Sequence, residues 1–106
     1  MQITVQRTGG IAGVNERLGP VDTDHVSGAV GSAISAKVEA IGFFDMPSEL
    51  EPSGVYDDFH MSVHVVDGGR DHTVSCDALS KDPAARGLGE LVKLLTDGGF
   101  DFEDQR

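Results

Sequence analysis

The sequence has few of the residues that stabilise a small protein by means other than an aliphatic core. It contains no tryptophan and a single cysteine, Cys76, and aromatic residues make up only 6% of the chain. An internal disulfide is therefore excluded, and aliphatic side chains must fill the core. With 106 residues, 39% of them apolar and 25% charged, the chain is long enough for one modest two-layer domain.

Long apolar runs and positive charge are also scarce. No stretch approaches the roughly 18 apolar residues of a membrane-spanning helix. The first residues, Met1–Thr4, lack the features of a secretory signal, so we expect a cytoplasmic protein. Eight Lys and Arg face eighteen Asp and Glu, which gives a formal net charge of −10. This charge disfavours nucleic acid and anionic membranes as partners and favours a basic protein surface.

The amino-terminal residues predict a β-hairpin. Strands are expected over residues 2–8 and 13–18, because apolar and polar residues alternate there. A turn between them places Ile3 opposite Leu18, unless a bulge shifts the register. The Gly19-Pro20 dipeptide is expected to end the second strand.

Two helices are predicted from apolar spacing and capping residues. The first begins with Asp22 as its N-cap and runs to about residue 41, with apolar residues recurring every three or four positions. The second has Asp82 as its N-cap and ends at Gly98 or Gly99. Each helix would bury one apolar stripe against a sheet.

A second hairpin is the most sharply defined element. Apolar and polar residues alternate from Phe59 to Val65, and Asp67-Gly68-Gly69-Arg70 is a strong signal for a two-residue turn. Closing the turn on its two glycines places the apolar residues of both strands on one face. The expected pairs are Val65 with His72, Val63 with Val74, and Met61 with Cys76.

Together these elements predict an α+β fold in the order strand-strand-helix-strand-strand-helix. The expected architecture is a four-stranded antiparallel sheet with two helices on one face. We expect residues 1–99 to form a single domain and residues 100–106 to form a loosely held acidic tail. The alternative for the tail is that Phe100 or Phe102 packs against the core.

The turn of the first hairpin is the main candidate site. Its sequence is Arg7-Thr8-Gly9-Gly10-Ile11-Ala12-Gly13. Glycine reaches positive φ without a Cβ clash, so the three glycines allow a tight reversal. Ile11 is a large apolar residue where an ordinary turn would carry Asn, Asp or Ser. We interpret the turn as a surface that presents Ile11 to another protein; the alternative is that Ile11 folds back over its own sheet.

A second candidate contact is the irregular segment 45–54, which is long for so small a domain. Its apolar Met46 and its acidic Glu49 and Glu51 could touch a partner. The alternative is a surface connection without a binding role.

No set of residues predicts catalysis or metal binding. His60 and His64 are four residues apart on one expected strand, which separates their Cα atoms by about 13 Å, too far to share a zinc ion. Cys76 is expected on the core face beside Asp77, unlike a reactive thiol. No segment assembles a nucleophile with an acid and a base. We therefore expect no enzymatic activity, no cofactor and no metal.

Three of these segments together resemble the emfourin family. They are Arg-x-Gly-Gly-x-Ala-Gly at residues 7–13, Gly42-Phe43-Phe44 after the first helix, and the hairpin from Asp67 to Val74. The resemblance spans about residues 1–97. Emfourins are small inhibitors of protealysin-type, thermolysin-like metalloproteases, so the resemblance implies such a protease as partner.

The resemblance also implies a mechanism, which is occlusion of the protease cleft in competition with substrate. A thermolysin-like enzyme has a zinc ion in its groove and a neighbouring pocket that favours bulky apolar residues. We expect Ile11 to enter that pocket and Arg7 and Ala12 to support the turn. The free inhibitor is expected to be a monomer.

Two other functions compete with inhibition. The first is an acidic adaptor module that binds a partner by strand addition at the exposed edge of the first hairpin. The second is a DNA mimic, which is disfavoured because the acidic residues are scattered rather than arrayed like phosphates.

Overall fold

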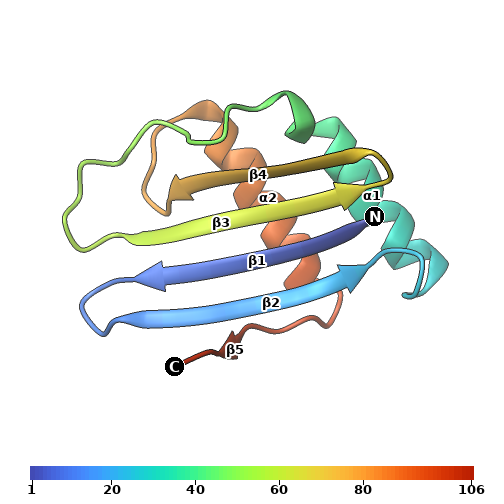
Figure 1. The fold of residues 1–106 in the computed structure, drawn as a ribbon, viewed down its shortest axis with the longest axis horizontal. Helices are drawn as coiled ribbons and strands as arrows, with labels where there is room; N and C mark the ends of the chain where they lie inside the picture. The colour runs from blue at the N-terminus through green and yellow to red at the C-terminus, as the bar shows by residue number, and fades with distance from the viewer.

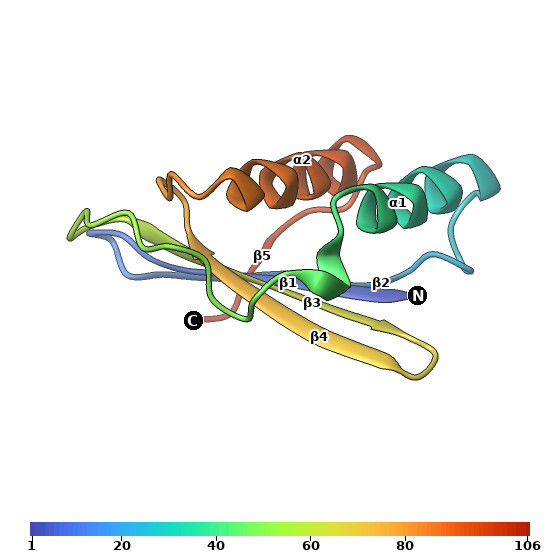
Figure 2. The same ribbon diagram turned by 90° about the horizontal axis from the view of Figure 1, so that it is seen from above.

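Five antiparallel strands form one sheet, and two helices cover one of its faces (Figure 1; Figure 2). The structure is a computed structural model that describes all residues from 1 to 106. The elements are β1 (Gln2–Gly9), β2 (Val14–Asp22), α1 (Gly28–Ala40), the short 3₁₀ helix η1 (Phe43–Asp45), β3 (Phe59–Asp67), β4 (Arg70–Asp77), α2 (Pro83–Asp97) and β5 (Glu103–Asp104). The strand order is β4-β3-β1-β2-β5. The predicted α+β fold is confirmed, with a short fifth strand added.

The first hairpin has a different register from the predicted one. Val5, not Ile3, lies opposite Leu18, and Ile3 lies opposite Val21. The turn itself sets the first of these pairs, because Gly9 lies opposite Val14 and the turn comprises residues 10–13. A bulge at Gly19-Pro20 then adds one residue to β2 and places Ile3 opposite Val21. The dipeptide therefore does not end the strand, which continues to Asp22. The bulge allows Leu18 and Val21 to be buried on the same face as their partners.

The second hairpin has the predicted register. Val65 pairs with His72, and Val63 pairs with Val74. Gly68 has a φ of +61°, which glycine adopts without a Cβ clash. Since the turn contains only two residues, its local chemistry fixes the register of the whole hairpin.

The first helix begins later than predicted. Ser27 is its N-cap, and its side chain accepts a hydrogen bond from the Val30 amide at 3.4 Å. Asp22, the predicted N-cap, instead ends β2 and accepts a hydrogen bond from the Asp24 amide at 2.9 Å. The Asp22 carboxylate thus stabilises the turn between strand and helix rather than the helix itself.

The core lies between the sheet and the two helices. Helix α2 begins as predicted, with the Asp82 carboxylate accepting a hydrogen bond from the Ala84 amide at 3.0 Å. Aliphatic side chains dominate this layer, as the shortage of aromatic residues requires. The fully buried ones include Ile3, Val5, Leu18, Ile34, Val38, Val63, Val65, Val74, Leu88, Leu91 and Leu95. Neither helix is long and apolar enough to cross a membrane.

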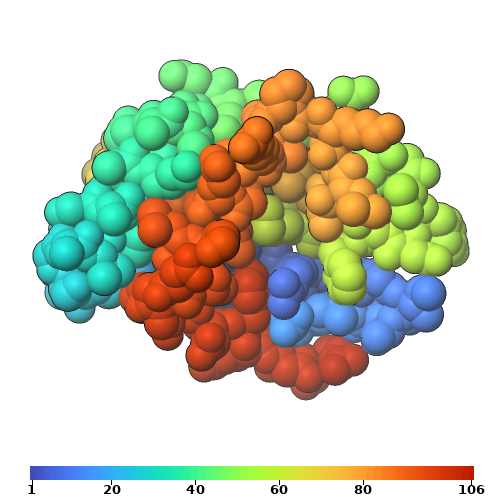
Figure 3. Space-filling model, turned by 180° about the vertical axis from the view of Figure 1, so that it is seen from behind, coloured from blue at the N-terminus to red at the C-terminus, as the bar shows by residue number.

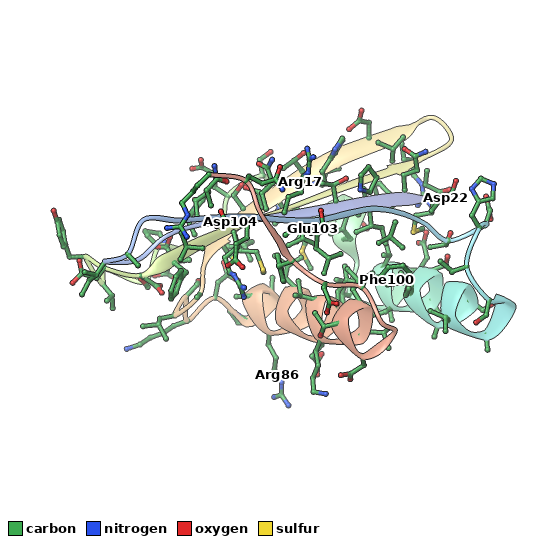
Figure 4. All side chains as sticks on the ribbon, turned by 90° about the horizontal axis from the view of Figure 1, so that it is seen from below. Arg17, Asp22, Arg86, Phe100, Glu103 and Asp104 are labelled. Carbon is green, nitrogen blue, oxygen red and sulfur yellow. The ribbon has the colours of Figure 1, made fainter.

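The residues after α2 are attached to the sheet. Phe100 and Phe102 pack against the core, and Glu103 pairs with Arg17 of β2 (Figure 4). The Arg7 guanidinium lies 4.2 Å from the centre of the Phe102 ring. The expectation of a loosely held tail is therefore wrong for these residues, and the alternative, in which a phenylalanine packs against the core, is correct.

Replacing Phe102 by alanine tests this attachment. We expect Phe102→Ala to lower the free energy of unfolding by about 1–2 kcal/mol, because it removes a half-buried ring and its contact with a guanidinium. Gln105→Ala, in the same segment but at an exposed position, is the matched control. Urea unfolding monitored by circular dichroism measures both variants. Equal stability of the two variants would show that the tail is not attached in solution.

Candidate functional site

The turn between β1 and β2 presents Ile11 to solvent. Gly9, Gly10 and Gly13 have φ values of +100°, +72° and +65°, and the Gly13 amide donates a hydrogen bond to the Gly10 carbonyl at 3.3 Å. The Ile11 side chain is 89% exposed. It therefore does not fold back over its own sheet, and the neighbouring Ala12 is exposed as well.

Side chains behind the turn connect its two strands. The Arg7 guanidinium donates to Oε1 of Glu16 through Nη2 at 2.9 Å and through Nε at 3.2 Å. These two residues are directly opposite each other on β1 and β2. The tail adds a further contact, because Nη1 of Arg106 donates to the Ala12 carbonyl at 3.4 Å. Arg7 thus supports the turn from behind, while Thr8 is exposed on β1.

Gly10 lies directly under an aromatic ring from the neighbouring strand. An ideal Cβ atom at Gly10 would be 2.8 Å from Cε1 of Phe59. Gly9 lies opposite Phe59 in the pairing of β1 with β3. The glycine at position 10 therefore serves two purposes, because it allows a positive φ and leaves room for the ring. Sequence reasoning identified only the first.

The second candidate segment is less exposed than predicted. Met46 is a core residue with 8% exposure, so in this structure it cannot contact a partner. Glu49 is exposed, but its backbone forms a parallel bridge with Ser75 at the edge of β4. Glu51 is also exposed, and its amide donates to Oδ2 of Asp82 at 3.2 Å. The structure does not bring these three residues together with the turn at Ile11.

Other apolar residues, which the sequence analysis missed, do share one end of the molecule with Ile11. In Figures 1 and 2 the β1–β2 turn and the segment that leads into β3 lie at the same end. From behind, both extend beyond the helices (Figure 3). The exposed apolar residues at this end, besides Ile11, are Val55, Tyr56, Phe59 and Leu79. A signal was available, since Tyr56 is an isolated aromatic residue in a polar, glycine-containing segment.

Comparison with protein families identifies the chain. The Emfourin family model matches residues 5–93. This match covers well over half of the sequence and includes both the β1–β2 turn and the segment before β3. The chain belongs to the emfourin family. Searches of curated proteins and of solved structures gave no significant match.

Emfourins are known as inhibitors of protealysin-type metalloproteases, so this is a family of protease inhibitors and not of enzymes. The side chains of this emfourin form no group of three or more His, Cys, Asp or Glu that could hold a metal ion. His60 and His64 are each paired with a carboxylate of β4, at 3.2 Å from Oδ1 of Asp77 and 2.7 Å from Oδ1 of Asp71.

A pocket of about 210 Å³ lies behind the turn, between α2 and the sheet. Arg7, Phe59 and Met61 line it, together with Cys76. Cys76 is only 3% exposed, and burial, followed by the charge of Asp77, raises the pKa of its thiol to about 11. The thiol therefore stays protonated near neutral pH and is no nucleophile.

The reactivity of Cys76 tests whether its thiol is buried and protonated in the native protein. Raising the thiol pKa from 9.0 to about 11 lowers the thiolate fraction roughly 100-fold, and burial lowers access further. We expect an aromatic disulfide reagent to modify native Cys76 at least about 100-fold more slowly than the same protein unfolded in urea. A native rate similar to the unfolded rate would show that the thiol is accessible and ionised.

Two alanine substitutions isolate the contact between Gly10 and Phe59. Gly10→Ala and Gly13→Ala should each lower the free energy of unfolding by about 1–2 kcal/mol, because alanine disfavours a positive φ. Of the two positions, only Gly10 has an aromatic ring within 4 Å of the added Cβ atom. We expect Gly10→Ala to be less stable in thermal unfolding by about a further 1 kcal/mol or more. It should also shift the Phe59 ring resonances in NMR spectra, whereas Gly13→Ala should not. Equal effects of the two substitutions would contradict the packing of Phe59 on Gly10.

Proposed function

We propose that this emfourin inhibits a thermolysin-like metalloprotease by inserting its β1–β2 turn into the active-site cleft, in competition with substrate. The observation that carries the proposal is the position of Ile11, a large apolar side chain 89% exposed at the end of a braced turn. Side chains of this kind normally lie in the core of a small domain, and its exposure does not stabilise the fold.

The turn has the properties of a preorganised ligand. Burying the Ile11 side chain in an apolar pocket of the protease contributes about 2–3 kcal/mol. Three contacts restrain the turn: the ion pair of Arg7 with Glu16, the hydrogen bond from the Gly13 amide to the Gly10 carbonyl, and the Phe59 ring on Gly10. Less entropy is therefore lost on binding. A flexible peptide of the same sequence would have to be ordered first.

Glycine also determines how close the turn can approach a cleft wall. Gly13 has no side chain and no neighbouring atom within 4 Å of an ideal Cβ position. The backbone groups around Ile11 can therefore lie against the wall of the groove, as those of an extended substrate do. A carbonyl oxygen of the turn is also a ligand type that a zinc ion in the protease accepts.

The net charge of −10 supports association with a cationic rim around such a cleft. The charge acts on the rate of encounter over a distance of about a Debye length, whereas Ile11 acts only in contact. The two features are thus complementary parts of one binding mechanism.

The competing function, an adaptor that adds a partner's strand to the first hairpin, has less support. β1 is a central strand, with β2 on one side and β3 on the other. The outer edge of β2 pairs with β5 at Glu16 and Arg17. At the opposite edge of the sheet, Glu49 forms a bridge with Ser75 of β4. Each edge is therefore partly covered by the chain itself.

Ile11→Asp tests the proposed contact. A charged side chain should not enter an apolar pocket, so we expect the inhibition constant to rise at least about tenfold, equivalent to about 1.4 kcal/mol. Ser32→Asp, which adds the same charge at an exposed position of α1, is the matched control. Circular dichroism and the melting temperature should stay unchanged in both variants.

The inhibition assay uses a protealysin-type protease with a fluorogenic peptide at several substrate concentrations. Competition with substrate should appear as an apparent inhibition constant that rises with substrate. Full inhibition by Ile11→Asp would show that the turn is not the contact, even if the protein is an inhibitor.

A further inference from the structure

The exposed large apolar side chains of this protein are gathered at one end. None of them lies on the outer surfaces of the helices or on the uncovered face of the sheet. Three separate parts of the chain supply them: the β1–β2 turn, the residues around the start of β3, and the connection from β4 to α2. They are Ile11, Val55, Tyr56, Phe59 and Leu79. Phe59 packs on Gly10, but a single contact at Ile11 leaves Val55, Tyr56 and Leu79 without a role.

Residues 53–58, here called the arm, are held in a fixed shape. The Ser53 amide donates to Oδ2 of Asp77 at 3.0 Å, and the Val55 amide donates to the Ser53 hydroxyl at 3.1 Å. The Asp58 amide closes the arm by donating to the Val55 carbonyl at 3.3 Å. Oδ2 of Asp58 accepts a hydrogen bond from the Leu79 amide at 2.8 Å. Two carboxylates thus connect the arm to β4 and to the residues that follow it.

Hydrogen bonds favour the ionised form of one of these carboxylates, Asp77. The Ser53 amide, together with the His60 ring, holds the pKa of Asp77 below its usual range. Asp77 therefore stays ionised to a lower pH than an ordinary aspartate, and its charge strengthens the hydrogen bond to the arm.

Tyr56 lies in the turn at residues 56–57 of the arm and is 99% exposed. A tyrosine there does not stabilise the fold, because almost none of its surface is buried. Tyrosine is, however, one of the residues that most often contribute strongly to protein–protein binding, since it presents a large amphipathic surface with few rotatable bonds. Placed on a braced arm, it loses little conformational entropy when a partner covers it.

The arm is adjacent to the β1–β2 turn. Phe59, which follows the arm, lies opposite Gly9, and its ring packs on Gly10. Neighbouring strands are about 4.8 Å apart, so the arm and the turn emerge from adjacent strands at the same end of the sheet (Figure 1). A protein large enough to surround Ile11 would therefore also reach the arm.

We propose that the arm is a second contact with the same metalloprotease, in which Tyr56 binds an apolar surface beside the cleft that receives Ile11. The proposal rests on the proposed inhibitory function. The exposed carboxylate of Asp57 next to Tyr56 fits a protease surface with a basic residue at its rim. A second copy of this chain is a poorer occupant, because a symmetric contact would bring Asp57 of each copy toward the other in a protein of net charge −10.

The first experiment is an inhibition assay with two variants of Tyr56. We expect Tyr56→Ala to raise the inhibition constant at least about tenfold, and Tyr56→Phe, which keeps the ring, to stay within about threefold of the wild type. Thr73→Ala, at an exposed position of β4 away from the arm, is the control and should inhibit normally. Melting temperatures should agree among the wild type and the two Tyr56 variants, because Tyr56 has almost no contacts to lose.

The second experiment observes Tyr56 directly. The chain contains only one tyrosine, so inhibitor labelled with fluorotyrosine gives a single fluorine NMR resonance from this residue. On addition of unlabelled protease, we expect this resonance to shift and to lose its sensitivity to exchange of water for deuterium oxide. Both changes report that the ring has left solvent. The protein alone should show neither change as its concentration rises.

The outcomes separate this inference from the proposed function. If the wild type inhibits but Tyr56→Ala inhibits equally well, or the fluorine signal stays solvent-exposed in the complex, the second contact is wrong and the function stands. If the wild type does not inhibit any protealysin-type protease, the proposed function fails and the second contact fails with it. A fluorine signal that changes with the concentration of the protein alone would identify a second copy as the occupant and overturn the proposal.

Discussion

The register of β1 between its two neighbours positions the proposed binding end, which consists of the β1–β2 turn and the arm. Ile3 and Val5 must face the core, since both are completely buried, and this fixes which residues of β2 and β3 lie beside them. As a consequence, Gly9 at the end of β1 lies opposite both Val14 and Phe59. The turn and the arm are therefore brought together by packing in the core, at some distance from any residue that contacts a partner.

The sequence predicted the parts of the fold whose geometry is set locally. The second hairpin has the expected pairs because a two-residue glycine turn leaves one register that buries its apolar residues. Helix α2 begins at its predicted N-cap, Asp82, for a similar reason. For Ile11 the sequence left two alternatives, a side chain exposed at the turn or one folded back over the sheet, and the structure has the exposed one.

Features that depend on residues distant in the chain were not predictable in this way. The bulge at Gly19-Pro20 is favoured because it allows Val21 to reach the core. The residues around the dipeptide do not predict this bulge, because its stabilising effect comes from packing against distant residues. The packing of Phe59 on Gly10 joins residues about fifty positions apart and cannot be derived from either one alone. Met46 was assigned to the surface for a similar reason, because its burial depends on how η1 packs against the sheet.

At the proposed binding end, polar and apolar side chains have different roles. Its carboxylates are largely engaged within the protein: Asp77 and Asp58 hold the arm, and Asp82 both caps α2 and accepts the Glu51 amide. Each of these bonds satisfies a backbone group that would otherwise have to find water. Among the apolar side chains at the same end, Ile11 and Tyr56 are 89% and 99% exposed, and nothing in the fold requires their exposure. A surface in which most polar groups are satisfied internally and large apolar groups are exposed binds mainly by excluding water, and an ion pair such as one to Asp57 adds to that effect. Its affinity should therefore depend mainly on the shape of the protease's apolar pockets, and its net charge mainly on how fast the two proteins meet.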